Sequence, residues 1–212
     1  MTEILIEGFN KTIIMVFFST LFSVILGFIP AIILIVTAPK GLKPNKTVFN
    51  TLDTIINILR GFPFIILMVA IMPLTKIIVG KSIGTTAAIV PLTIAAAPFV
   101  ARIIESALKE VDPGVVEAAK SFGASNTQII FKVMLKEAVP SIISGLTLTI
   151  ISIIGYSAMA GTVGAGGLGD LAVRYGYQRY QTDVMIVTVI ILVIIVQVLQ
   201  MLGNYLYKKL SR

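Results

Sequence analysis

Few side chains of this sequence are suited to catalysis or to metal binding. Its 212 residues include no His and no Cys, which removes the commonest general base, the commonest metal ligand and every thiolate nucleophile. We expect Asp53, Glu105 and Asp183, which lie far apart in the sequence, to be solvated or paired charges near helix ends. Glu105 follows Arg102 by three residues, a spacing that permits an ion pair on one helix face. The sequence therefore predicts no catalytic residue, no cofactor and no metal ion.

Two short motifs have the spacing of nucleotide-binding loops, but their surroundings do not fit. Residues 164–169 read G-x-G-x-x-G, yet a dinucleotide site needs a strand before this motif and a helix after it, and here an apolar helix precedes it. Residues 80–82 match the end of a phosphate-binding loop, but Thr75 stands where that loop needs its first glycine. We expect the glycines of 164–169 to let the backbone bend and pack closely.

The elements that carry these residues are predicted to be membrane helices. Hydrophobic residues make up 57% of the chain and charged residues only 13%, against about 25% charged in soluble domains. The mean hydropathy is +1.00, so lipid must solvate part of the surface. We therefore predict an all-α polytopic membrane protein, with residues 1–212 forming a single transmembrane domain. Five apolar runs are long enough to cross a bilayer, namely 12–37, 52–74, 83–104, 142–161 and 184–202.

Some residues within these runs indicate how the helices pack. Arg60 is expected to point into a helix bundle or towards the nearer interface, because a charge at the centre of a span costs about 2.5–3.5 kcal/mol. Pro91 and Pro98 are expected to kink the third helix. Gly27 has serines four and eight residues before it on the same face of the first helix, and small residues at this spacing favour close helix packing.

The distribution of positive residues predicts the orientation of the chain. The sequence has 17 Lys and Arg against 10 Asp and Glu, and in membrane proteins such an excess concentrates in cytoplasmic loops. Five spans put the termini on opposite sides, which predicts an external N-terminus and a cytoplasmic C-terminus. The cytoplasmic side would carry Lys40, Lys43, Lys46, Lys109, Lys120, Lys132, Lys136, Lys208, Lys209 and Arg212, with Arg60 and Arg102 close to it. The external side would carry only Lys11, Lys76, Lys81, Arg174 and Arg179.

The longest polar stretch, residues 112–140, is predicted to be a helical elbow in the cytoplasm. Asp112 and the proline after it form a strong helix start, and Gly123 is placed to end that helix in a left-handed turn. Ser125 and Gln128 have the spacing of a capping box, so a second helix is expected to begin there.

The second helix of the elbow is expected to give way to the fourth span at its proline, Pro140. Its apolar face would consist of Ile129, Ile130, Val133, Met134 and Ala138, and its polar face of Gln128, Lys132 and Lys136. Amphipathic helices of this kind either lie on lipid headgroups or bind a partner protein, and the amphipathic pattern alone leaves both possibilities open.

The same stretch resembles the EAA loop of ABC-importer permeases. The resemblance is carried by Glu117, Ala118 and Ala119, by Gly123 four residues after the last of them, and by the Val-Pro pair that ends the stretch. It implies the type I importer permease fold, in which the first short helix is the coupling helix, seated on an ATP-hydrolysing subunit. Asp112 would cap that coupling helix. ATP and its magnesium ion would then be bound by the partner and not by this chain.

Segment 60–64 resembles an R-x-x-P segment of the amino-acid permeases of this family, and segments 88–102 and 155–170 resemble its methionine-importer branch in particular. The resemblance implies a homodimer of this chain in the bacterial inner membrane, two ATP-binding subunits on the cytoplasmic side and an external substrate-binding lipoprotein. It also implies alternating access as the transport mechanism. Importers of another amino acid or of a methionine derivative remain open, as do an ATP-independent channel or secondary carrier and a non-transporting scaffold.

The fourth span carries the candidates for the translocation pathway. Tyr156, Ser157 and Met159 are bulky or polar, lie beside glycines and belong to the helix that continues from the elbow. By resemblance to the methionine importers, Met159 would form an outer gate. The alternative that Met159 is only a flexible packing residue stays open.

Overall fold

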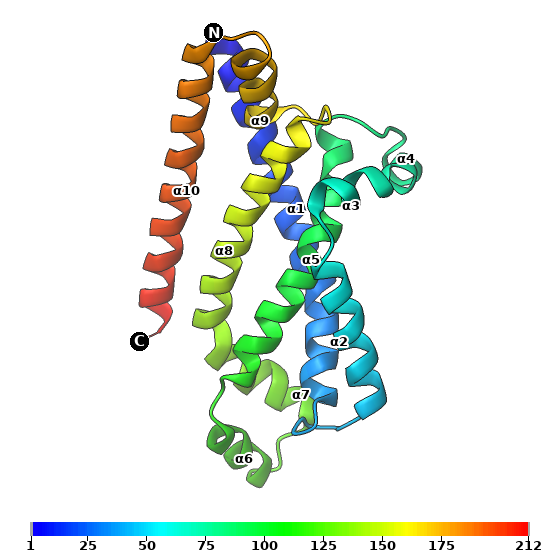
Figure 1. Cartoon of the computed structure of the whole chain (residues 1–212). Coiled ribbons are helices and arrows are strands. Elements are labelled where there is room, and N and C mark those ends of the chain that lie inside the picture. The colour runs from blue at the N-terminus through cyan, green and yellow to red at the C-terminus, as the bar shows by residue number, and fades with distance from the viewer. Residues whose placement is uncertain (1, 212) are drawn as a thin grey trace.

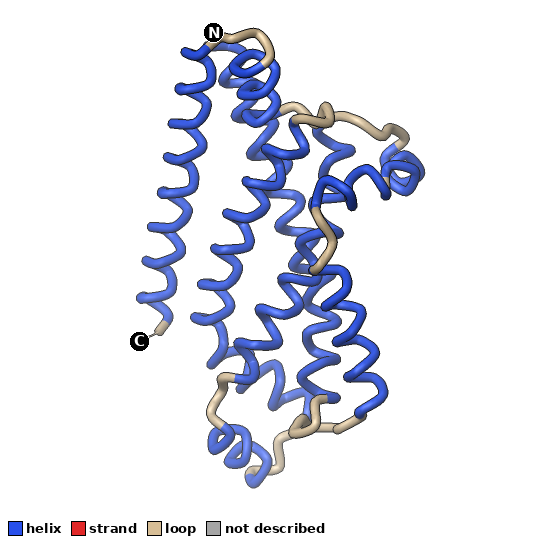
Figure 2. Tube along the Cα trace, in the orientation of Figure 1, coloured by secondary structure: helices blue, strands red, loops and turns tan. Residues whose placement is uncertain are grey.

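The computed structural model describes residues 2–211, and within that range the chain is built from helices joined by turns and loops, with no strand (Figures 1 and 2). The all-α class predicted from the sequence is confirmed. In chain order the elements are α1 (Thr2–Thr37), α2 (Lys46–Arg60), α3 (Phe64–Ala70), α4 (Met72–Val79), α5 (Thr85–Lys109), α6 (Pro113–Ser121), α7 (Asn126–Gln128), the π-helical turn η1 (Ile129–Met134), α8 (Leu135–Gly161), α9 (Gly167–Leu171), the π-helical turn η2 (Ala172–Tyr177) and α10 (Thr182–Leu210).

Four continuous helical segments within the described residues are long and apolar enough to cross a membrane: α1, α5, the run 126–161 and α10. The expected span 52–74 is not a single helix. It is divided into α2, α3 and α4, and α2 and α3 meet at 100°, so they can form a fifth span only as a bent pair (Figure 2). The break falls at Gly61–Pro63, where the proline lacks an N–H and restricts the residue before it.

Helix α1 lies against α5 along most of its length, and the two form the centre of the bundle. Ser19 and Ser23 are completely buried. At Gly27 the backbones come so close that a Cβ atom would lie 2.6 Å from the carbonyl oxygen of Ala97. The close packing expected from these small residues is therefore confirmed, and α5 runs unbroken through both of its prolines.

The elbow forms with the predicted caps but without the predicted break at Pro140. Asp112 accepts a hydrogen bond from the Gly114 N–H at 2.7 Å, Gly123 is left-handed, and the capping box at Ser125 is complete. Beyond it α7, η1 and α8 continue as one helical run, with Pro140 inside α8. A proline removes only one helical hydrogen bond, and the buried apolar face of this run outweighs that loss.

The two ends of the bundle are different in character (Figure 1). Loop 38–45 and α6 gather at one end, and the N-terminus gathers with 162–181 at the other. At the second end the glycine-rich segment packs on α1, where the N–H of Leu168 donates to Thr12 Oγ1 at 2.9 Å. Gly167 has a φ of +87°, and a Cβ atom there would meet the same hydroxyl. The expectation that these glycines allow bending and close packing is confirmed.

Candidate functional site

Helix α6 is the most exposed apolar element at the polar end of the molecule. It contains no buried residue, and Phe122, which caps its C-terminus, is 91% exposed. Val115 is also exposed. Apolar side chains gathered on one exposed helix are typical of a surface that a partner covers. The described structure thus presents α6 as a short, capped helix set apart from the bundle (Figure 1).

The structure brings all the predicted coupling residues together on this element. Asp112 caps the helix, Glu117 and Ala118 are exposed along it, Ala119 is half-buried, and Gly123 makes the turn after it. Their positions follow from local signals, because a cap and a left-handed glycine bound the helix on either side.

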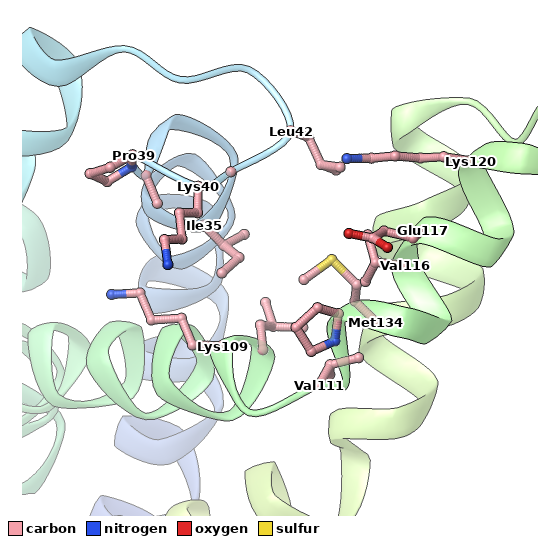
Figure 3. Close-up of a pocket in the computed structure, with 14 residues that line it drawn as sticks. Ile35, Pro39, Lys40, Leu42, Lys109, Val111, Val116, Glu117, Lys120 and Met134 are labelled. Atoms are coloured by element: carbon pink, nitrogen blue, oxygen red, sulfur yellow. The ribbon is translucent and has the colours of Figure 1, made fainter.

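A cavity of about 520 Å³ separates α6 from the loop after α1 and from the end of α5. The Glu117 carboxylate and Lys120 both extend towards this space from α6 (Figure 3). Arg102 does not reach this cavity and is paired with Asp53 and Glu105. The cavity is lined mainly by apolar side chains and by lysines, among them Ile35, Leu42, Val111, Val116, Met134, Lys40 and Lys109.

A cluster of paired charges joins α2 to α5 above this cavity, and sequence reasoning found only part of it. The Arg102–Glu105 ion pair was predicted and is confirmed at 2.6 Å. Glu105 is completely buried, and Lys109 lies 2.5 Å from its second oxygen. Arg102 also binds Asp53 of α2 at 2.6 Å. Asp53 was expected to be a solvated or paired charge, but no sequence signal identified Arg102 as its partner, because the two residues are 49 positions apart.

Two of the three pathway candidates, Tyr156 and Met159, are three residues apart and share one side of α8, whereas Ser157 points to another side. Tyr156 is half-buried, and its ring stacks on Phe64 of α3 with centroids 4.8 Å apart. Ser157 is buried and donates to the carbonyl oxygen of Ile154 at 2.7 Å, within its own helix. Met159 is 44% exposed. Tyr156 and Met159 are therefore open to neighbours outside α8, whereas the hydroxyl of Ser157 is already bonded.

Tyr156 also borders a small hollow between α5 and α8. The hollow has a volume of about 110 Å³ and is lined by mostly apolar side chains. Phe99, one of these, has its ring beneath Arg60, whose guanidinium carbon lies 5.0 Å from the ring centroid. Arg60 therefore points into the bundle, as one of the two sequence expectations proposed, and its charge rests on an aromatic face.

Comparisons with known proteins agree on one kind of protein. The family model described as "Binding-protein-dependent transport system inner membrane component" matches residues 23–212. A probable D-methionine transport system permease protein of Vibrio cholerae is 50% identical over 210 residues, covering 99% of this chain and 93% of that protein. A methionine import system permease protein of Bacillus subtilis is 43% identical and covers 82% and 78%.

The fold is similar to that of a chain in a crystal structure described as an inward-facing conformation of the MetNI methionine ABC transporter. The two chains are 43% identical, the TM-score is 0.98, and the match covers 100% of this chain and 98% of the other.

Proposed function

Because this chain belongs to the family of binding-protein-dependent transport system inner membrane components, we propose that it is the subunit that moves methionine across the membrane in an ATP-driven importer. The chain is a multi-pass inner membrane permease of an ABC transporter. The proposal of methionine rests on similarity to permeases named for methionine or D-methionine in several bacteria. Another amino acid remains an alternative substrate, because an external binding protein would select what is delivered.

One observation of the structure carries the mechanism, namely the capped helix α6, which contains no buried residue. We propose that α6 is the coupling helix, that it docks on an ATP-binding subunit, and that this partner binds ATP with magnesium and hydrolyses it. Asp112 and Gly123 fix the ends of the helix, while Glu117, Ala118 and Ala119 form its contact surface. Phe122 would fill an apolar recess of the partner, since a fully exposed aromatic ring gains about 1.5–3 kcal/mol on burial.

The complete transporter would contain two copies of this chain, two ATP-binding subunits and an external binding lipoprotein. This assembly is supported by the similarity of the chain to a permease chain of the MetNI methionine ABC transporter. We place the N-terminus and 162–181 outside and loop 38–45 with α6 in the cytoplasm. The excess of lysines at the α6 end supports this orientation. Arg212, counted for the cytoplasmic side, lies outside the described residues.

The transport cycle would be alternating access between two arrangements of the paired bundles. Tyr156, Ser157 and Met159 of α8 would lie along or beside the pathway near its outer end. Met159 would form the outer gate, and its substantial exposure supports contact with a neighbour across the pathway. Tyr156 would be held in place by its stack on Phe64.

Reconstitution tests this function. The chain would be purified with its ATP-binding subunit, placed in proteoliposomes with the binding lipoprotein, and assayed for uptake of labelled L- and D-methionine. We expect uptake that requires both ATP and the lipoprotein. Stable co-purification with no uptake of either form would point to another substrate. A chain that conducts solutes without any ATPase subunit would contradict the importer and favour a channel.

A further inference from the structure

Helix α2 is attached to the bundle by unusually little apolar packing. Its only buried residue is Ile56, whereas α5 has buried residues along its whole length. The face of α2 that meets α5 carries Phe49, Asp53, Asn57 and Arg60, at spacings of four, four and three residues. These spacings put all four side chains on one side of the helix, and each of them contacts a polar or aromatic group of α5 or of its own helix.

Charged and amide groups add to the apolar contact that Ile56 makes in the core. We call this network the α2–α5 clamp. Arg102 binds Asp53 Oδ1 at 2.6 Å and Glu105 Oε2 at 2.6 Å, and it donates to Asn57 Oδ1 at 3.0 Å. Asn57 in turn donates to Asp53 at 3.0 Å, and Lys109 lies 2.5 Å from Glu105. The clamp therefore consists of Asp53, Asn57, Arg102, Glu105 and Lys109.

Cation–π contacts extend the clamp towards both ends of α2. The Lys109 ammonium lies 5.5 Å from the centre of the Phe49 ring at one end. The Arg60 guanidinium lies 5.0 Å from that of Phe99 at the other. The two antiparallel helices are thus joined at three successive levels, by Phe49 with Lys109, by Asp53 with Arg102 and by Arg60 with Phe99. Helix α5 contributes two of the three cations and α2 contributes one.

This network is hard to open because its central carboxylate has no access to water. Glu105 is completely buried, and a buried charge that loses its partner is strongly destabilising. Moving α2 away would take Asp53 and Asn57 from Arg102, one of the two cations that hold Glu105, and would leave its guanidinium with one carboxylate partner instead of two. The two helices are therefore expected to move as one body, unlike helices that slide on apolar surfaces.

The clamp lies between the proposed motor contact and the proposed pathway. Its last residue, Lys109, ends α5, and α6 begins at Pro113. At its other end α2 leads through the 100° bend into α3, whose Phe64 stacks on Tyr156. A continuous set of contacts thus runs from α6 through the clamp to α8.

We propose that the α2–α5 clamp couples α6 to α3. A displacement of the coupling helix α6 would then move Phe64 of α3, the ring that stacks on Tyr156. This inference rests on the proposed importer function. Asp53 is the positioning residue that matters most, because it is the only charged group that α2 contributes to the clamp. Neither Asp53 nor Arg102 touches the substrate.

The test measures uptake and ATP hydrolysis in the same proteoliposomes. Asp53→Asn keeps the shape of the side chain and removes its charge. We expect hydrolysis to persist and uptake per ATP to fall by about tenfold, within the range of ordinary coupling energies. Asp53→Glu, which restores the charge, should recover most of the uptake. Glu7→Gln is the matched control, because it removes an ion pair that lies within one helix, and it should change neither rate.

A cross-link separates coupling from folding. Because the chain contains no Cys, Phe49→Cys and Lys109→Cys introduce the only two thiols of this subunit, at the end of the clamp nearest α6, and the same variant without cross-linker is the reference because it already lacks the Lys109–Glu105 ion pair. A short bifunctional thiol reagent should join α2 to α5 and restore uptake per ATP in the Asp53→Asn background. If the cross-link instead stops uptake in a chain that keeps Asp53, the two helices must separate in each cycle and the proposal is overturned.

Two other results would also contradict the coupling role of the clamp. If Asp53→Asn lowers the melting temperature but leaves uptake per ATP unchanged, the clamp is only structural and the proposal is wrong. If Asp53→Asn does not assemble, Asn57→Ala, at an exposed position, is expected to lower uptake per ATP to a smaller extent, and an unchanged ratio would again contradict it. Failure of the importer function itself is distinguishable, because the unmodified chain would then show no uptake driven by ATP.

Discussion

Two glutamates show how strongly position determines the role of one residue type in this molecule. Glu105 is completely buried and is held by two cations. Glu117 lies on the exposed face of α6, at the edge of a cavity that Lys109 of the clamp lines as well. A buried carboxylate with its partners fixes helices in place, whereas an exposed one remains free to bind another protein.

The role of Glu117 can be tested by reversing its charge. Glu117→Lys should lower uptake by at least roughly tenfold while the chain still inserts, because a like charge at an interface costs several kcal/mol. The measurement is methionine uptake together with the amount of ATP-binding subunit that co-purifies. Glu137→Lys, at another exposed glutamate of segment 112–140, should transport normally. Normal uptake by the Glu117 variant would count heavily against the docking surface.

The gate proposed at Met159 leads to a different prediction. Met159→Ala should leave assembly intact and raise ATP hydrolysis without substrate by severalfold, since losing such a side chain changes a conformational balance by about 1 kcal/mol. ATPase assays with and without methionine measure this. If coupling between hydrolysis and uptake is unchanged, Met159 is only a packing residue.

At the scale of elements, local signals predicted α6. Long-range contacts determined the angle between α2 and α3 and the continuous helix through Pro140. The caps at Asp112 and Ser125 and the turn at Gly123 depend on groups within three residues, so the sequence alone predicted the candidate coupling helix. The angle between α2 and α3 could not be predicted, because it depends on packing against α5 and α8. The helix through Pro140 persists for a similar reason, since distant residues bury its apolar face.

The contact between α1 and α5 predicts a large effect of side-chain size at one glycine. Gly27→Leu should destabilise the chain by about 1–3 kcal/mol, the usual cost of overpacking, because the backbone of α5 occupies the space. Gly155→Leu is the matched control, since nothing lies within 4 Å of a Cβ atom there. Thermal unfolding in detergent would compare them, and equal melting temperatures would show that the helices separate easily at this point.

At the scale of the whole molecule, the unequal ends of the bundle give it a direction in the membrane. Two aromatic residues mark these ends with nearly equal exposure, Phe122 at 91% and Tyr180 at 89%. They lie on the α6 end and on the 162–181 end respectively. Because the chain has no Cys, a thiol placed at either position can be followed without background.

Labelling with a membrane-impermeant maleimide tests the orientation. In intact spheroplasts that express the chain without its ATP-binding subunit, Tyr180→Cys should react fully and Phe122→Cys should react only after permeabilisation. The bias of lysines towards the α6 end is the physical reason for this orientation. The reverse pattern would place α6 outside and would remove the basis for cytoplasmic docking.

The hydrogen bond from Leu168 to Thr12 also has a consequence for biosynthesis. Its two residues are 156 positions apart, so at about 5–20 residues per second the ribosome needs roughly 10–30 seconds to deliver the second after the first. During that time α1 lies in the bilayer without the glycine-rich segment beside it. The Thr12 hydroxyl must then form its hydrogen bond within α1. Packing of this subunit is therefore completed late in synthesis, when the glycine-rich segment around Leu168 packs on α1.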